Sequence, residues 1–262
     1  MRILVILFAV VMPVVAWLSN TGTFGPDNGA VSDHYPTLLV AAGYAFAIWG
    51  LIFLLDLVYA FWQSRRVLRG DPTLRKIAPW AAGGFALTTV WMPLFSMGVA
   101  QPGLFWLCLV VIFGAVFCLL RAARVLPLDD TPQRGQWLWA WAPLSLHAGW
   151  LSLAAFLNLA QVIVAFDLLP TDDMTMWSLL LLALAAALLL WMNQRMRGNI
   201  DYALAALWGL VAVYIKQSHS ALVGADTLAW AALGVAAVLA VQTIWLRVRH
   251  PGRLLPNPNR AE

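Results

Sequence analysis

The chain has 262 residues, of which 62% are hydrophobic and only 11% are charged. A soluble domain of this length could not bury so much apolar surface, so the composition excludes an ordinary soluble protein and predicts an all-α membrane protein. The net charge of +4 does not indicate a nucleic-acid partner, because the basic residues fall in short clusters between apolar runs. Cys108 and Cys118 lie about 15 Å apart along one apolar helix, which excludes a disulfide between them.

Eight apolar runs are long enough to cross a hydrocarbon core, which takes roughly 20 residues in a helix. In chain order they are 3–18, 37–63, 79–99, 103–123, 138–165, 174–192, 201–217 and 227–246. The runs are apolar on all faces, whereas the strands of a membrane barrel alternate. We therefore predict a polytopic helical bundle of about eight transmembrane helices in the lipid bilayer.

The first run permits a second interpretation, a cleaved signal peptide, because Arg2 precedes an apolar stretch that ends at Ala16. Val14 occupies the position where a cleavage site prefers a small residue, and Pro13 interrupts the stretch. These residues favour a membrane helix. Cleavage would leave seven spans with the same orientation.

The basic residues predict the orientation, since cytoplasmic loops of membrane proteins carry an excess of Lys and Arg. With the N-terminus inside, all but one of the 16 Lys and Arg fall in inside segments, and the exception is Lys216. The outside loops at 19–36 and 166–173 carry aspartates instead. We expect a protein of the inner (cytoplasmic) membrane with both termini, including a tail at 251–262, in the cytoplasm.

Three of the 15 tryptophans are expected deep in the bilayer. Trp49, Trp91 and Trp150 each lie twelve or thirteen residues from the cytoplasmic end of their run, which places them roughly 18–20 Å above that face. Three large rings at one level form a plausible wall for a flat apolar ligand. The alternative is that they fill the bundle core or face lipid.

Two ionisable residues also fall inside predicted spans, where polar groups are costly and often functional. Asp56 is expected about 9 Å deep and His147 about 15 Å deep. Asp56 has three candidate partners: a ligand, His147, or the nearby Arg65 and Arg66. His147 could bind a metalloporphyrin or accept a proton. A hydrogen bond between helices is the simpler alternative for both.

The segment around Trp150 resembles a known family. Trp150-Leu-Ser152-Leu-Ala154-Ala-Phe156-Leu157-Asn158 is similar to the W-x-S-x-A-x-[YF]-L-N signature of the TspO/MBR family, the tryptophan-rich sensory proteins related to translocator protein and the peripheral benzodiazepine receptor. Trp91-Met92-Pro93-Leu94-Phe95 resembles its N-x-x-W-S-P-L-F stretch, with Thr88 at the Asn position. Gly43-Tyr44 through Phe53 resembles its P-P-G-W-V-F…W-T-x-L-Y stretch, with Ala41-Ala42 in place of the double proline.

The resemblance implies that residues 1–165 form a TspO-like five-helix bundle around a cavity, capped by residues 19–36. Residues 166–250 would then be three additional transmembrane helices. Pro93 and Pro143 each remove a helical hydrogen bond, which a bundle tolerates where the gap is buried or lines a cavity. Together with the residues deep in the spans, this gives as candidate ligand-binding residues, with Asp56 as a possible polar partner, Tyr44, Trp49, Thr88, Trp91, Pro93, His147, Trp150 and Asn158.

The implied function is the binding of a hydrophobic, planar molecule, a tetrapyrrole or a sterol-like compound, with a sensory or transport-related regulatory role. No cofactor is required, although porphyrin or haem would be a ligand. Two alternatives stay open: a membrane-embedded enzyme acting on an apolar pigment or lipid, and a small secondary transporter. The sequence has no HExxH or G-x-S-x-G motif, so we predict no catalytic or metal-binding residues. Gly83 and Gly84 permit close helix contacts, so a homodimer is allowed but not specified.

Overall fold

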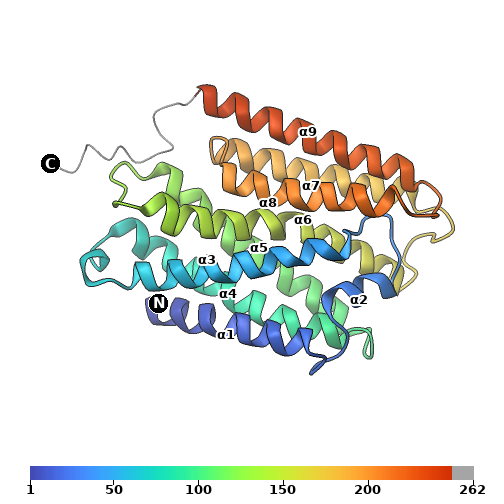
Figure 1. The fold of residues 1–262 in the computed structure, drawn as a ribbon, viewed down its shortest axis with the longest axis horizontal. Coiled ribbons are helices and arrows are strands. Elements are labelled where there is room, and N and C mark those ends of the chain that lie inside the picture. The colour runs from blue at the N-terminus through green and yellow to red at the C-terminus, as the bar shows by residue number, and fades with distance from the viewer. Residues whose placement is uncertain (250–262) are drawn as a thin grey trace.

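The computed structural model describes residues 1–249, and this part of the chain is all helical, without a β-strand (Figure 1). The helices are α1 (Arg2–Asn20), α2 (Asn28–His34), α3 (Ile48–Gln63), α4 (Pro72–Met97), α5 (Leu104–Val125), α6 (Ala142–Ala165), α7 (Thr175–Arg195), α8 (Ile200–Gln217) and α9 (Ala225–Arg249). Short turns of other helix types are η1 (Gly43–Ala47), η2 (Arg66–Leu68), η3 (Leu126–Leu128) and the π turn η4 (Trp137–Trp141). The all-α fold class is confirmed. The predicted tail at 251–262 lies outside the described residues.

Eight of these helices correspond to the eight predicted runs. Within residues 1–249, six segments are long and apolar enough to cross a membrane: α1, η1 with α3, α5 with η3, η4 with α6, α7 and α9. The other two, α4 and α8, are less apolar and lie between neighbours, α4 against α1 and α5, and α8 against α6 and α9. The chain is a multi-pass membrane protein.

The prediction of one helix over 37–63 is wrong for its first part, since α3 begins only at Ile48. We call residues 37–47 the strap. Its backbone is hydrogen-bonded by α8: the Ala42 N–H donates to the Ala212 oxygen at 3.1 Å, Trp208 Nε1 donates to the Ala45 oxygen at 2.9 Å, and Gln217 Nε2 donates to the Thr37 oxygen at 3.2 Å. Non-helical backbone is tolerated at membrane depth only where protein satisfies it in this way.

Two other differences from the predicted elements arise from aspartate caps. Within the loop at 19–36, Asp27 accepts a hydrogen bond from the Ala30 N–H at 3.0 Å and starts α2. Helix α4 starts at Pro72 rather than at residue 79, because Asp71 accepts from the Leu74 N–H at 2.8 Å and proline suits the first helical turn.

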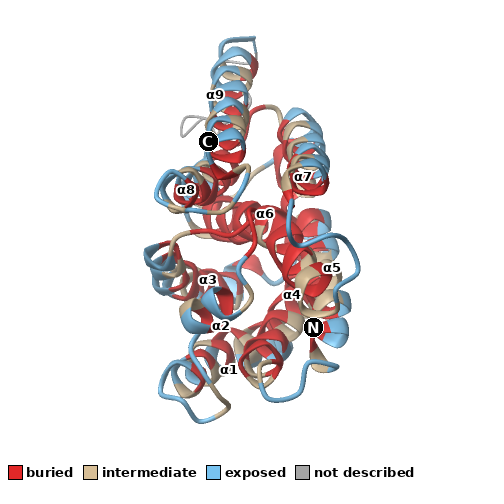
Figure 2. Cartoon of the chain, turned by 90° about the vertical axis from the view of Figure 1, so that its right-hand side faces the viewer, coloured by how far each residue is buried: buried red, intermediate tan, exposed pale blue. Residues whose placement is uncertain are grey.

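Helix α6 lies at the centre of the bundle and is buried along most of its length (Figure 2). It packs against α3, α5, α7 and α8. Its approach to α8 is close: a Cβ at Gly149 would collide with the Tyr202 carbonyl oxygen, and one at Gly209 would lie 2.6 Å from a methyl of Leu153. These two glycines therefore join the first five long helices to the last three.

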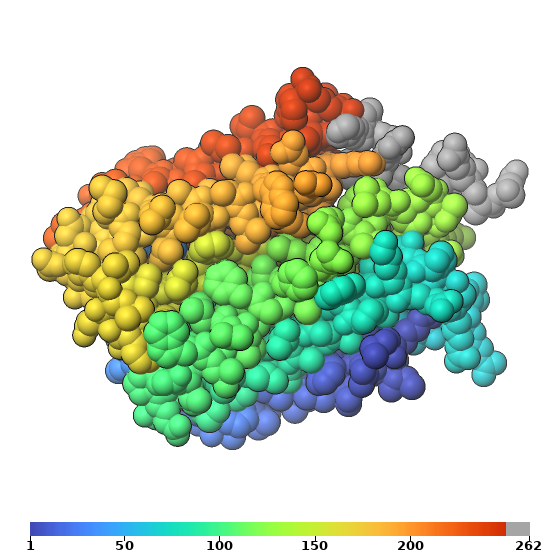
Figure 3. All heavy atoms as spheres, turned by 180° about the vertical axis from the view of Figure 1, so that it is seen from behind, coloured from blue at the N-terminus to red at the C-terminus, as the bar shows by residue number. Residues whose placement is uncertain are grey.

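The outer surface of the bundle is apolar where it would meet lipid. Figure 3 shows the face on which α1, α4, α5 and α7 lie side by side. Large apolar side chains are exposed along α5 and α7, including Val110, Phe117, Leu180 and Trp191. By contrast, Gly83 and Gly84 face inward, toward Cys118 and Leu119 of α5, so the structure uses them for packing within one chain.

The basic residues gather at one end of the bundle, where the N-terminus and the end of α9 lie (Figure 1). Arg2 donates to the Leu68 oxygen at 2.7 Å, which joins the start of α1 to the α3–α4 loop. Gln133 donates to Asp71 at 2.9 Å, which joins that loop to the α5–α6 loop. At the opposite end, Lys216 of α8 pairs with Asp33 of α2 at 2.7 Å.

Candidate ligand-binding site

The three deep tryptophans meet in the interior of the bundle, although they come from three helices. The ring centroid of Trp49 on α3 lies 6.1 Å from that of Trp91 on α4 and 6.2 Å from that of Trp150 on α6. All three are more than nine-tenths buried. Counting residues along the helices thus placed them correctly at one level.

A small enclosed cavity lies beside these rings, between the strap, α2, α4 and α6. It holds about 20 Å³ of free space, which is room for about one water molecule. Its lining consists of Ser32, Val40, Ala41, Phe46, Trp91, Phe95, Trp150, Ala154, Leu157, Asn158 and Gln161. The wall is therefore mostly apolar and aromatic, with neutral polar groups from α2 and α6.

The polar groups of the cavity include two buried donors without an acceptor. Trp91 Nε1 donates to Asn158 Oδ1 at 2.8 Å, and Asn158 Nδ2 donates to Gln161 Oε1 at 3.4 Å. Among the described residues nothing accepts from Gln161 Nε2 or from Trp150 Nε1. Sequence reasoning missed Gln161, although it lies one helical turn beyond Asn158 and so shares its face.

Asp56, His147 and Thr88 form a hydrogen-bonded chain on the other side of Trp49. Asp56 Oδ2 lies 2.8 Å from His147 Nδ1, and His147 Nε2 lies 3.3 Å from Thr88 Oγ1. The structure thus selects His147 among the three predicted partners of Asp56. Both ring nitrogens are engaged, so His147 could bind a haem iron only after losing one of these bonds.

The remaining predicted residues lie away from the cavity. Tyr44 is in η1, where its half-exposed ring packs edge-on against Trp208 of α8 at 5.3 Å, because the strap turns toward α8 before α3 begins. Pro93 is inside α4 but does not line the cavity. Pro143 is in the first turn of α6, directly after the π turn η4.

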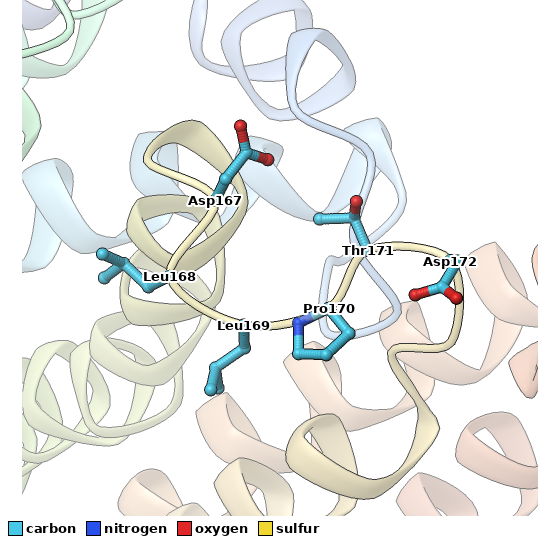
Figure 4. Close-up of a pocket in the computed structure, with 6 residues that line it drawn as sticks. All are labelled: Asp167, Leu168, Leu169, Pro170, Thr171 and Asp172. Atoms are coloured by element: carbon cyan, nitrogen blue, oxygen red, sulfur yellow. The ribbon is translucent and has the colours of Figure 1, made fainter.

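A second hollow, formed by Asp167–Asp172 between α6 and α7, is an open surface loop (Figure 4). Its side chains point in different directions and come from one segment only, so nothing converges on a ligand. Just beyond it, hydrogen bonds from Thr175 hold the pKa of the Asp173 carboxyl below its usual range. Residues 1–249 contain no group of three or more His, Cys, Asp or Glu able to hold a metal ion.

Comparison with protein families identifies the chain. The model of the family described as TSPO-like protein matches residues 2–245. The chain belongs to this TSPO-like family. No curated protein and no solved structure matches it significantly.

The family match reaches beyond the first five long helices and includes α7, α8 and most of α9. The structure shows where the segment from Trp150 to Asn158 lies in this TSPO-like protein. Trp150, Ala154, Leu157 and Asn158 line the cavity, whereas the Ser152 hydroxyl donates back to the Ala148 oxygen of its own helix at 2.7 Å.

Proposed function

We propose that this TSPO-like membrane protein binds a flat apolar molecule in the cavity beside Trp49, Trp91 and Trp150. The observation that carries the proposal is a pair of buried N–H donors, on Trp150 and Gln161, that line an apolar cavity and have no acceptor among the described residues. A buried donor without a partner costs about 1–3 kcal/mol. A ligand that brings a hydrogen-bond acceptor would recover that free energy.

The lining favours a neutral ligand over a charged one. Its polar side chains are Ser32, Asn158, Gln161 and the indole groups, and no Lys, Arg or His lines the cavity. A carboxylate buried there without a cation would be strongly disfavoured. Within the tetrapyrrole and sterol-like classes, we therefore expect the cavity to bind molecules whose hydrogen-bond acceptor is a carbonyl, an ester or a hydroxyl.

The cavity must widen to admit such a ligand, because drug-sized molecules occupy about 300–1,000 Å³. One wall of the cavity is formed by the strap and the short helix α2 instead of by a long helix. Both are bonded to α8, the strap through Trp208 and Gln217 and α2 through Lys216. Displacement of this wall would let the ligand in and would change the contacts of α8. That link supports a sensory or transport-related regulatory role. The basic end of the bundle is proposed to face the cytoplasm of the inner membrane.

The test is a fluorescence titration of the detergent-solubilised protein with protoporphyrin dimethyl ester and, in parallel, with the diacid. We expect saturable tryptophan quenching with about one ester per chain and at least tenfold weaker binding of the diacid. Gln161→Leu and Trp150→Phe should each weaken the binding of the ester by about tenfold, because the loss of one buried hydrogen bond costs about 1–1.5 kcal/mol.

Trp191→Phe provides the matched control, because this indole is half-exposed on α7 and should leave the affinity unchanged. Thermal unfolding of each variant separates lost binding from lost folding. Linear quenching that is equal in all proteins would reject binding in this cavity. Equal affinities for ester and diacid would reject the preference for a neutral ligand.

A further inference from the structure

The chain Asp56–His147–Thr88 takes no part in the proposed ligand contacts, yet it is buried more completely than the cavity wall. Asp56 and His147 have no exposed surface and Thr88 has 1%. The three side chains come from α3, α6 and α4. Asp56 Oδ1 has no hydrogen-bond partner within residues 1–249. An ionisable pair at this depth is expensive to maintain and commonly functional.

The number of protons that the pair carries decides its charge. With an ionised Asp56 and a neutral His147 the pair is an anion. One additional proton, on either the carboxylate or the imidazole, makes it neutral overall. Because charge transfer into an apolar interior is costly, the bundle favours the neutral form strongly. The geometry needs no rearrangement, because one proton is shared between Oδ2 and Nδ1, which are 2.8 Å apart, in both forms, and the additional proton is taken up at Nε2, 3.3 Å from Thr88 Oγ1.

Thr88 keeps its hydrogen bond in either state. When His147 Nε2 carries no proton, the threonine hydroxyl can donate to it, and when Nε2 carries a proton, the same hydroxyl can accept. A hydroxyl is the kind of neighbour that tolerates both forms of an imidazole. A carbonyl group, which only accepts, or an ammonium group, which only donates, would stabilise only one form at this position.

The surroundings contain few other groups that could exchange protons with the pair. On α3, Tyr59 lies one turn from Asp56 with its hydroxyl buried and without a partner among the described residues. On α1, the Arg2 guanidinium donates to the Leu68 oxygen in the α3–α4 loop. Arg75 and Lys76 lie more than three helical turns before Thr88 on α4, and Tyr202 of α8 approaches α6 beside Gly149. The His147 ring itself packs against two aromatic rings, Trp49 at 5.6 Å and Phe85 at 5.9 Å.

We infer that Asp56 and His147 form an intramembrane proton-binding site, linked to the ligand cavity through Trp49. The proton comes from water and binds at His147 Nε2, the proton shared between Nδ1 and Oδ2 is retained, and no other bond changes. Trp49 provides the link, because its ring packs edge-on against His147 at 5.6 Å while also contacting Trp91 and Trp150, which line the cavity. The proton site stands on its own geometry, whereas its linkage to a ligand rests on the proposed function.

The first experiment measures protonation without any ligand. Infrared difference spectra of the full-length protein in lipid nanodiscs are recorded between about pH 5 and pH 9, above the range in which exposed carboxyls titrate. We expect a carboxylic-acid band that changes with pH, together with a pH-dependent ¹⁵N imidazole signal from His147. Both changes should disappear in Asp56→Asn, and the carboxyl change should be altered in His147→Gln.

Two variants keep this test interpretable. Asp201→Asn removes another carboxyl, at the start of α8, and should leave the spectral changes intact. Thr88→Val removes the hydroxyl but no titratable group, and should move the titration midpoint without abolishing it. Thermal unfolding confirms that each variant is folded. If neither signal changes with pH in the wild-type protein, the pair is a fixed link between helices and the inference is overturned.

The second experiment measures linkage, using the affinity for protoporphyrin dimethyl ester over the same pH range. The ester groups carry no titratable carboxyl, so a pH dependence reports the protein. We expect at least a fivefold change in Kd in the wild-type protein and in Asp201→Asn, and a flat profile in Asp56→Asn. A flat wild-type profile beside a titrating infrared band would overturn the linkage. If the ester does not bind at any pH, the proposed function and the linkage are both rejected. The proton-binding site is then judged by the infrared experiment alone.

Discussion

Two regions of the bundle bury polar side chains between helices, but they differ in how well those side chains satisfy one another. Between α7 and α9, Asn193 Nδ2 donates to Gln242 at 2.8 Å and to Thr243 at 3.0 Å. Gln242 and Thr243 in turn donate to backbone oxygens of α7 and α9. Of these groups only Asn193 Oδ1 lacks a partner among residues 1–249.

On α3, α4 and α6, seven buried groups lack a partner among the described residues: Trp49 Nε1, Asp56 Oδ1, Tyr59 Oη, Gln63 Oε1, Ser96 Oγ, Trp150 Nε1 and Gln161 Nε2. Polar side chains that hold membrane helices together are expected to pair with each other. Polar side chains that bind a ligand or a proton are expected to have free donors and acceptors when nothing is bound. Apart from Asn193 Oδ1 and the Ser178 hydroxyl, the buried polar groups of α7 and α9 are paired in packing, and the contrast with α3, α4 and α6 supports the proposal that the latter groups serve binding.

The largest effect is expected when the buried pair loses one partner. His147→Leu leaves the Asp56 carboxylate buried alone and should reduce the free energy of unfolding by about 3–5 kcal/mol, as measured by denaturant titration in mixed micelles. The double variant Asp56→Leu/His147→Leu carries no buried charge and should recover most of this loss. A double variant as unstable as the single one would mean that packing, not charge, sets the cost.

The next effect tests the close approach of α6 to α8. Gly149→Ala places a methyl against the Tyr202 carbonyl oxygen and should cost about 1–3 kcal/mol by forcing α6 and α8 apart. Gly234→Ala in α9 is the matched control, because a Cβ there meets nothing within 4 Å, and it should not destabilise the protein. Thermal unfolding in detergent measures both. Equal stability of the two variants would contradict the close approach of α6 to α8.

A smaller effect is expected in the region that uses polar residues for packing. Asn193→Leu removes the links to Gln242 and Thr243 and should cost about 0.6 kcal/mol, and at most about 1.7 kcal/mol, which are the average and the maximum for hydrogen bonds between membrane helices. Binding of protoporphyrin dimethyl ester should stay within twofold of the wild-type value. A loss of ligand affinity in this variant would show that α7 and α9 act on the cavity and would remove the contrast between the regions.

The smallest effect concerns the ion pair between Lys216 and Asp33, at the end of the bundle opposite the basic residues; both side chains are at least one-third exposed. Lys216→Ala should change the unfolding free energy by no more than about 1 kcal/mol, because water and salt screen such pairs. The wild-type advantage should fade as salt is raised. A large loss of unfolding free energy that does not depend on salt would instead show that Lys216 is needed to pack α8 against α2.

Much of the fold follows from the sequence alone, because eight long apolar runs can only be satisfied in a bilayer as helices. The same local rules placed Trp49, Trp91 and Trp150 at one depth, since a helix rises by a constant amount per residue. Three other features also follow from local sequence, but composition and hydropathy alone do not predict them. They are the start of α2 after Asp27, the start of α4 after Asp71 and the position of Gln161 one turn beyond Asn158.

Only the tertiary structure decided the rest. The break before Ile48 could not be read from an apolar run, because the groups that satisfy the strap backbone come from Ala212, Trp208 and Gln217, far along the chain. The choice of His147 as the partner of Asp56 likewise depends on how α3 and α6 face each other. The constant rise of a helix sets the depth of a residue in the membrane. Which neighbour its side chain faces is set by the packing of the helices, and the close approach of α6 to α8 at Gly149 and Gly209 is one such contact.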